Sequence, residues 1–169
     1  MLKSYSMRHN TFDIVKELQR LFEDRGASLS TAESCTGGLI SHYITSVAGS
    51  GNYFSGGVVS YSEEMKKNIL GISPETISAH GVVSEEIARE MAERSIAVSG
   101  TDYSVSSTGN LGPDVLEHKE KGLVYIAASG NGKTVSRELR LNGDREANKE
   151  EAVFEALKLL LELVEEEGS

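Results

Sequence analysis

Apolar residues recur at spacings of three and four along several stretches of the chain, which is the pattern of an amphipathic helix. In the first stretch Phe12, Val15 and Phe22 share one face, and in the last stretch Leu157 and Leu160 do. Serine, proline and glycine residues at the ends of these stretches act as start and stop signals. The helices predicted in this way cover about residues 11–25, 39–47, 62–70, 74–80, 84–96 and 144–164.

Short runs of β-branched, aromatic or alternating residues predict strands between these helices. The first runs from Ala27 to Ala32, and the residues from Ser129 to Lys133 are expected to form a hairpin turn between the last two. Because strands and helices alternate along much of the chain, we expect a three-layer α/β/α sandwich with a mixed, mostly parallel sheet. The other predicted strands cover about residues 56–61, 102–108, 122–128 and 134–141.

Length and composition fit one globular domain. The chain has 169 residues, of which 38% are hydrophobic and 25% charged, and a chain of this length can bury a substantial core. We assign residues 11–169 to this single domain, with Asn10 or Thr11 capping its first helix. Residues 1–10 carry no pattern and are expected to form a loose lead-in.

Charge and cysteine content restrict the partners and the compartment. The formal net charge is −9, which argues against nucleic acid or an acidic membrane as a partner. A single cysteine, the lack of a signal-peptide pattern and the lack of a long apolar run favour the cytoplasm. The four histidines are scattered without metal-ligand spacing, so we expect neither a metal nor a cofactor. The sequence leaves open whether the protein is a homo-oligomer.

The turn after the first predicted strand is the most informative stretch. It places Ser34 and Cys35 just before Thr36, Gly37 and Gly38, and a predicted helix follows directly. Open α/β sheets bind ligands at the carboxyl ends of their strands, where the N–H groups of the next helix also point. We therefore expect a nucleophile here, with N–H groups around Thr36 to Gly38 stabilising an oxyanion.

A base for this nucleophile can come from the second predicted strand and the helix after it. If that strand pairs with the first, Ser34, Tyr61 and Lys66 meet at one edge of the sheet. A lysine that burial keeps neutral can take the proton of a serine, and Tyr61 can relay that proton or donate a hydrogen bond. The trio then supports acyl transfer.

Simpler roles for the same residues stay open. Ser34 can cap the following helix, Tyr61 can end a strand with its ring half-buried, and Lys66 can be a solvated helix residue. Cys35 is an alternative nucleophile, although a lone cysteine is more often a small buried apolar residue.

Three further places could contact a ligand. Gly57 lies in a predicted strand that begins with two glycines, and the absence of side chains on these glycines allows a neighbouring strand or a ligand to approach the backbone closely. Thr108 and Gly109 begin a loop with hydroxyls and glycines, which can present N–H groups to a phosphate or simply connect elements. Arg145 follows Gly143 at the start of the last helix, where it is either a surface residue or a guanidinium clamp for phosphate.

Several motifs together resemble the C-terminal domain of the competence/damage-inducible protein CinA, a family known as nicotinamide-nucleotide amidohydrolase. The resemblance runs from about Phe12 to Val164, and its most specific part is the first motif. The motifs are T-A-E-S-C-T-G-G at 31–38, F-S-G-G-V-V-S-Y-S at 54–62 with Lys66, H-G-V-V-S at 80–84, S-T-G at 107–109 with Gly112-Pro113, and G-D-R at 143–145.

The resemblance implies hydrolysis of nicotinamide mononucleotide to nicotinic acid mononucleotide and ammonia, without a metal. The family's serine, tyrosine and lysine match Ser34, Tyr61 and Lys66. The chain departs from the family pattern after Thr108, where a glycine pair and a proline are missing. A nucleotide-binding module that has lost catalysis is therefore the alternative, and a structural or interaction domain is a third hypothesis.

Overall fold

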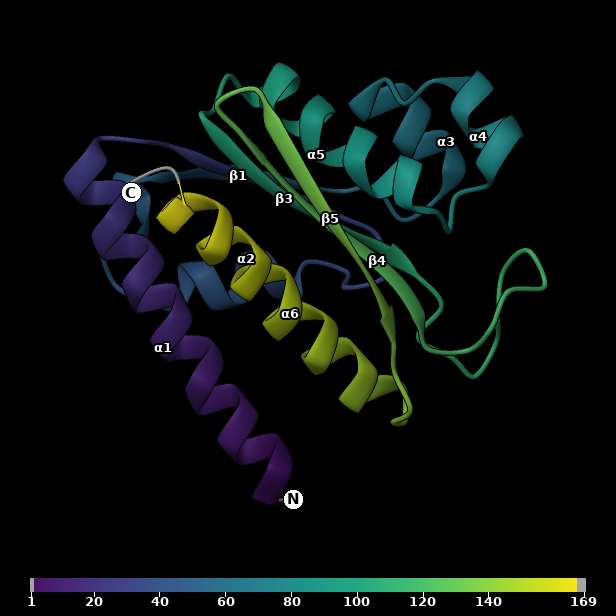
Figure 1. Ribbon diagram of the computed structural model, residues 1–169, viewed down its shortest axis with the longest axis horizontal. Helices are drawn as coiled ribbons and strands as arrows, with labels where there is room; N and C mark the ends of the chain where they lie inside the picture. Colours follow the sequence, from purple (N-terminus) through teal and green to yellow (C-terminus); the bar gives the residue numbers. More distant parts are fainter. Residues whose placement is uncertain (1, 167–169) are drawn as a thin grey trace.

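A computed structural model of the protein describes residues 2–166, with side chains for residue 8 and for residues 10–166 (Figure 1). It consists of helices packed on both faces of one five-stranded sheet. The elements in chain order are α1 (Leu2–Arg25), β1 (Leu29–Glu33), α2 (Leu39–Thr45), η1 (Ser50–Asn52), β2 (Phe54–Val59), α3 (Glu63–Met65), η2 (Lys66–Leu70), α4 (Pro74–His80), α5 (Glu85–Ser99), β3 (Tyr103–Gly109), β4 (Leu123–Gly130), β5 (Lys133–Arg140) and α6 (Arg145–Glu166).

The sheet has the strand order β2-β1-β3-β4-β5. Strand β1 pairs in parallel with β2 and β3, whereas β4 is antiparallel to both β3 and β5. The predicted α/β sandwich with a mixed sheet is confirmed: β1, β2, β3 and β5 run in one direction and β4 runs in the other. No helix connects β3 to β4 or β4 to β5, and a strand that follows without a crossover helix pairs antiparallel.

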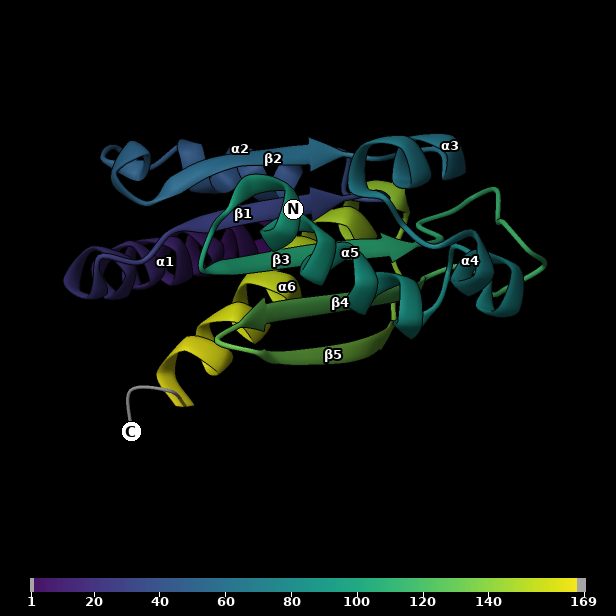
Figure 2. The ribbon, with the colours of Figure 1, turned by 90° about the horizontal axis from the view of Figure 1, so that it is seen from above.

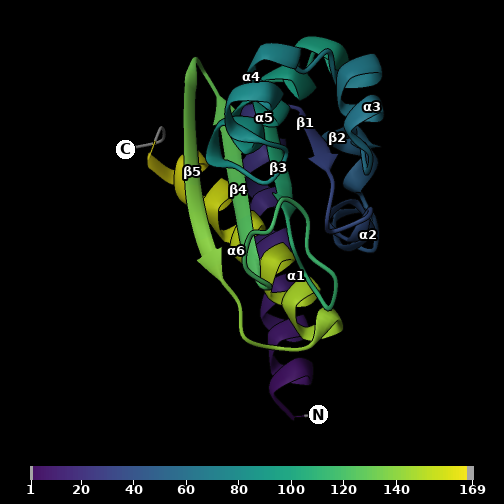
Figure 3. The same cartoon turned by 90° about the vertical axis from the view of Figure 1, so that its right-hand side faces the viewer.

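The two faces of the sheet carry different helices. Helices α1, α2 and α6 cover one face, and α3, η2, α4 and α5 lie on the other (Figures 1 and 3). The main core lies between the sheet and the first set of helices, with Phe22, Ile126 and Leu157 among its buried members. A smaller core around Ile72 and Met91 lies beneath α5. None of the helices between residues 2 and 166 is long and apolar enough to span a membrane.

The first helix begins earlier than the sequence predicts. Helix α1 starts at Leu2, and its first half extends beyond the sheet (Figure 1). The loose lead-in over residues 1–10 is therefore wrong for residues 2–10, and Asn10 and Thr11 lie within the helix instead of capping it. Residues 2–10 contain neither glycine nor proline to stop a helix, and Arg8 pairs with Glu146 and Glu150 on α6.

The carboxyl ends of β1, β2 and β3 lie together at one end of the sheet (Figure 2). The turn into α2, the segment from β2 to η2 and the loop after β3 all start there. Parallel pairing of β1 with both neighbours creates this arrangement. The segments that carry Ser34, Tyr61 and Lys66 therefore approach one another at this end of the sheet.

Candidate active site

Ser34 follows directly after β1, at the edge of the sheet where the three strands end. Its N–H donates to the carbonyl of Ser107 at 2.9 Å, which extends the pairing of β1 with β3 by one residue. Gly37 and Gly38 then turn the chain into α2 with φ angles of 61° and 98°. These angles strain residues that carry a side chain, so the turn needs glycine at both positions.

Glu33, the last residue of β1, holds this turn in place. Its carboxylate is fully buried and accepts hydrogen bonds from the N–H groups of Gly38, Ile40 and Ser41. It also accepts from the hydroxyls of Ser41 and Thr36 at 2.8 and 2.7 Å. A buried carboxylate with five donors in place of a cation is satisfied by hydrogen bonding alone. Glu33 thus fixes the start of α2 relative to Ser34.

Lys66 contacts Ser34 directly. Its Nζ lies 2.8 Å from Ser34 Oγ and donates a hydrogen bond to the carbonyl of Ser60, also at 2.8 Å. The side chain is 1% exposed, and burial is the main reason why the pKa of Lys66 falls to about 8. The predicted meeting of Ser34 and Lys66 is therefore present, with the amine buried and easier to deprotonate than a solvated lysine.

Lys66 is the first residue of a π-helical turn. The sequence predicts one short helix from Ser62 to Leu70, but α3 ends at Met65 and Lys66 begins the wider turn of η2. Ser62 caps α3 by accepting from the N–H of Met65. Single π turns inside helices are frequent at functional sites, because they redirect one side chain.

Cys35, the alternative nucleophile, lies beside Ser34 but is buried. Burial raises the pKa of its thiol to about 12, and a thiol is nucleophilic only as the thiolate. Of the two candidates, Ser34 is the one whose side chain is hydrogen-bonded to the amine of Lys66.

Tyr61 lies apart from Ser34 and Lys66. Its side chain is 60% exposed, and its hydroxyl accepts a hydrogen bond at 3.1 Å from the guanidinium of Arg145. Arg145 also donates to the carbonyl of Gly112 at 2.6 Å. The structure thus joins Tyr61, Arg145 and the loop after β3 into one group beside the Ser34 turn. A direct proton relay through Tyr61 has no contact to support it among the described residues.

The N–H groups of the turn divide into two sets. Gly37 donates to the carbonyl of Ser34, and Gly38 donates to Glu33. The N–H groups of Cys35 and Thr36 have no acceptor in another described residue. If an oxyanion forms next to Ser34, these two N–H groups are available for it, whereas those of Gly37 and Gly38 are occupied.

Internal packing accounts for the other predicted ligand contacts. A Cβ on Gly57 would lie 2.0 Å from the hydroxyl of Thr31 in β1, and one on Gly109 would lie 2.6 Å from the carbonyl of Leu123 in β4. The hydroxyl of Thr108 donates to the carbonyl of Val82 at 2.7 Å. These residues therefore bring elements of the protein close together beside the site.

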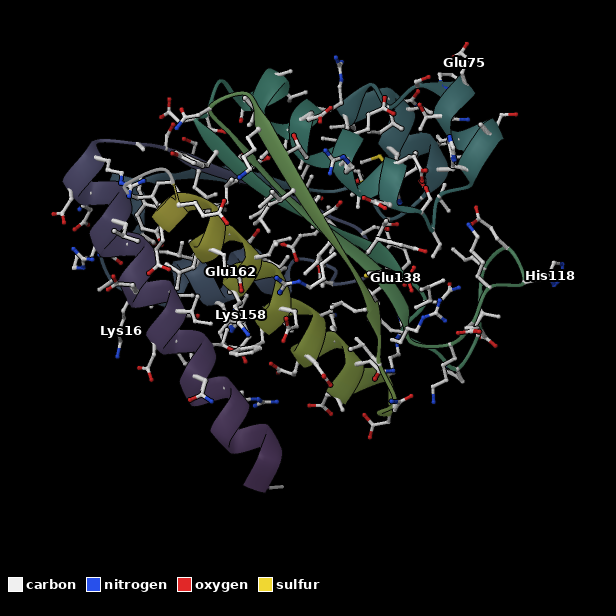
Figure 4. All side chains as sticks on the ribbon, in the orientation of Figure 1. Lys16, Glu75, His118, Glu138, Lys158 and Glu162 are labelled. Carbon is white, nitrogen blue, oxygen red and sulfur yellow. The ribbon has the colours of Figure 1, made fainter. Side chains whose placement is uncertain are left out.

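Sequence reasoning did not anticipate how the loop after β3 is anchored. Glu117 accepts hydrogen bonds from the N–H groups of Val82 and Val83 just before α5, and Lys119 pairs with Glu117 and donates to the carbonyl of Val83. His118 lies at the outer tip of this loop (Figure 4). Among the described residues no cluster of histidine, cysteine and acidic side chains could hold a metal ion.

The comparison with protein families agrees with these features. The model of the CinA C-terminal domain matches residues 11–164. The chain belongs to this family. Within the CinA domain, Ser34, Lys66 and Arg145 all lie inside the matched region.

Curated relatives support the same assignment and are longer than this chain. A putative competence-damage inducible protein of Symbiobacterium thermophilum is 44% identical over 151 residues, which cover 83% of this chain and 35% of the relative. One from Bacillus subtilis is 39% identical over 153 residues, covering 90% of this chain and 37% of the relative. The CinA domain thus spans little more than a third of the curated relatives that it matches.

Solved structures of the family have the same fold. The competence damage-inducible protein A of Klebsiella pneumoniae is 34% identical with a TM-score of 0.87, and the match covers 90% of this chain and 95% of that one. The competence/damage inducible protein CihA of Agrobacterium tumefaciens is 33% identical with a TM-score of 0.88, and the match covers 91% and 95%. The three-layer arrangement is therefore that of the CinA superfamily.

Proposed function

We propose that this CinA domain is an amidohydrolase that converts nicotinamide mononucleotide to nicotinic acid mononucleotide and ammonia. The observation that carries the proposal is the buried amine of Lys66, 2.8 Å from Ser34 Oγ. Neither a solvated lysine nor a capping serine needs such a contact, whereas a serine nucleophile does. The choice of this amide as substrate comes from the resemblance of the motifs.

The first half of the reaction transfers the acyl group to Ser34. Ser34 Oγ attacks the carbonyl carbon of the carboxamide while neutral Lys66 takes the hydroxyl proton. The negative charge that develops on the carbonyl oxygen is stabilised by the N–H groups of Cys35 and Thr36. When the C–N bond breaks, Lys66 returns the proton to the leaving nitrogen, which departs as ammonia.

The second half releases the acid. A water molecule attacks the acyl-serine, Lys66 takes one of its protons, and the bond to Ser34 Oγ breaks as that oxygen regains a proton from Lys66. The products are a carboxylic acid and the free enzyme. In this scheme Lys66 moves each proton, while Tyr61 and Arg145 lie where they can contact the rest of the substrate.

A test measures ammonia release from nicotinamide mononucleotide. Ser34→Ala should reduce kcat by at least about 10³-fold, because the attacking oxygen is lost. Cys35→Ala is the matched control at the neighbouring position and should keep kcat within about threefold, because the buried thiol stays protonated. A Cys35→Ala protein without activity beside an active Ser34→Ala protein would overturn the assignment.

The alternative is a module that binds nucleotides without hydrolysing them. The anchored loop after β3 favours it, because Glu117 and Lys119 fix this segment to the residues before α5. Tight binding of the mononucleotide without ammonia release by the wild-type protein would select this alternative.

A further inference from the structure

Lys149 lies over the turn that carries the nucleophile. Its Nζ is 3.3 Å from the position that a Cβ would take on Gly37, and Gly37 itself donates a hydrogen bond to the carbonyl of Ser34. Lys149 is four residues after Arg145 on α6, so the two side chains share one face of that helix. One positive charge therefore lies over the Ser34 turn, and a second lies one helical turn earlier on the same face of α6.

Unlike many cations of this chain, Lys149 has no carboxylate partner among the described residues. The chain has 26 acidic and 17 basic residues, so carboxylates are in excess. Two acidic residues that flank Lys149 in α6, Glu146 and Glu150, pair with Arg8 instead. Lys149 is only partly exposed, so its charge is neither neutralised nor fully solvated.

Arg145 is more heavily engaged. Its two terminal nitrogens already donate hydrogen bonds to the carbonyl of Gly112 and the hydroxyl of Tyr61. Part of the hydrogen-bonding capacity of Arg145 is therefore used within the protein. The ammonium of Lys149 keeps its donors available. A phosphate monoester carries close to two negative charges and several acceptor oxygens, and it suits an ammonium next to a guanidinium.

We propose that Lys149 binds the phosphate of the substrate over Gly37, and that it makes the site selective for mononucleotides over nucleosides. The proposal rests on the proposed function, since it places the phosphate relative to Ser34. Lys149 acts on binding and touches none of the reacting atoms. Its loss should therefore change KM and leave kcat largely unchanged.

The test compares nicotinamide mononucleotide with nicotinamide riboside, which lacks the phosphate. Lys149→Met keeps much of the apolar stem and removes the charge. It should raise KM for the mononucleotide about tenfold or more, because a charge-assisted hydrogen bond is lost. Both kinetic constants for the riboside should stay within about twofold. Lys149→Arg should restore KM to within about threefold of wild type.

Lys158 supplies the matched control. It is an exposed lysine nine residues further along α6 than Lys149 (Figure 4), which is about 13 Å along the helix axis. Lys158→Met should leave KM for the mononucleotide unchanged. An unchanged KM in Lys149→Met, or an equal rise for mononucleotide and riboside, would overturn the proposal while leaving the hydrolase activity in place.

Calorimetric titration separates this proposal from the proposed function. If the wild-type protein releases no ammonia, the proposed function fails, but binding of the mononucleotide can still be measured. Weaker binding by Lys149→Met than by Lys158→Met would then uphold the phosphate contact. Equal affinity of the wild-type protein for mononucleotide and riboside would reject it.

Discussion

Lys66 must be neutral before it can take a proton from Ser34, and its burial decides at which pH that occurs. The pKa of Lys66 falls from an ordinary value of 10.5 to about 8, mainly because burial disfavours the charged amine. Electrostatic interactions with Cys35, Glu63 and Glu117 oppose this shift in pKa but do not cancel it. At neutral pH a minor but usable fraction of the free enzyme therefore holds the base in its active form.

This predicts a rising pH profile. Below pH 8 Lys66 is mostly protonated, so kcat/KM should increase about tenfold per pH unit and level off above about pH 8. Lys66→Arg should be inactive throughout, because guanidinium keeps its proton. The measurement is kcat/KM for ammonia release between about pH 6 and pH 10, a span of roughly two units on each side of the pKa of Lys66. A flat profile, or activity in Lys66→Arg, would show that another group is the base.

The sequence predicts contacts between residues correctly where the reactive residues follow directly after strands that pair with each other. Ser34 and Lys66 follow strands that pair in parallel, so their positions after those strands were enough to predict their meeting. Tyr61 was expected beside them, but its hydroxyl contacts Arg145. Sequence spacing gives no side-chain direction for a residue just beyond a strand, and so it could not separate these outcomes.

At the scale of elements, Glu33 connects the end of β1 to the start of α2. Its carboxylate accepts three backbone N–H groups that the helix start would otherwise leave unpaired. The sequence does not predict this role, because glutamate is rarely fully buried without a charged partner. The surrounding T-A-E-S-C-T-G-G motif was informative, but nothing in it indicates that the acid is buried.

Glu33→Gln tests this connection. An amide presents an NH₂ group where the carboxylate presented only acceptors, so at least one buried N–H group should lose its partner. We expect the free energy of unfolding to fall by about 2–3 kcal/mol, and kcat to fall because the Ser34 turn loosens. Urea denaturation and ammonia release measure the two effects. Glu64→Gln, at an exposed position in α3, should change the stability by less than about 0.5 kcal/mol; a Glu33→Gln protein as stable as this control would contradict the role.

The elements themselves were largely predictable, and the exceptions have physical causes. The spacing of apolar residues by three and four predicts the positions of α5 and α6. The Asn131-Gly132 pair predicts the two-residue turn that joins β4 to β5, and both residues have positive φ angles there. The π turn of η2 was missed because an α-helix and a π turn place almost the same residues on one face. The early start of α1 was missed because the sequence of residues 2–10 shows no clear apolar stripe, and the ion pairs of Arg8 with α6 cannot be read from that pattern.

At the scale of the whole molecule, overall charge and local charge have opposite signs. The chain carries a net charge of −9, yet Lys66, Arg145 and Lys149 gather at one end of the sheet. An anionic ligand would be repelled over most of the surface and attracted at this end. The sequence gives the total charge, but only the parallel pairing of β1 with β2 and the start of α6 reveal where the cations collect.

Ser34 and Lys66 come from two different layers of the sandwich, since Ser34 lies at the end of β1 in the sheet and Lys66 belongs to η2 in the helical layer on one face. Their 2.8 Å contact therefore depends on how the helical layer that contains η2 packs against the sheet. A shift of about 1 Å between layers would disrupt a hydrogen bond while leaving every helix and strand intact. In a urea titration, ammonia release should therefore decline at lower urea concentrations than the far-ultraviolet circular dichroism signal. Coincident transitions would mean that the layers separate only when the whole domain unfolds.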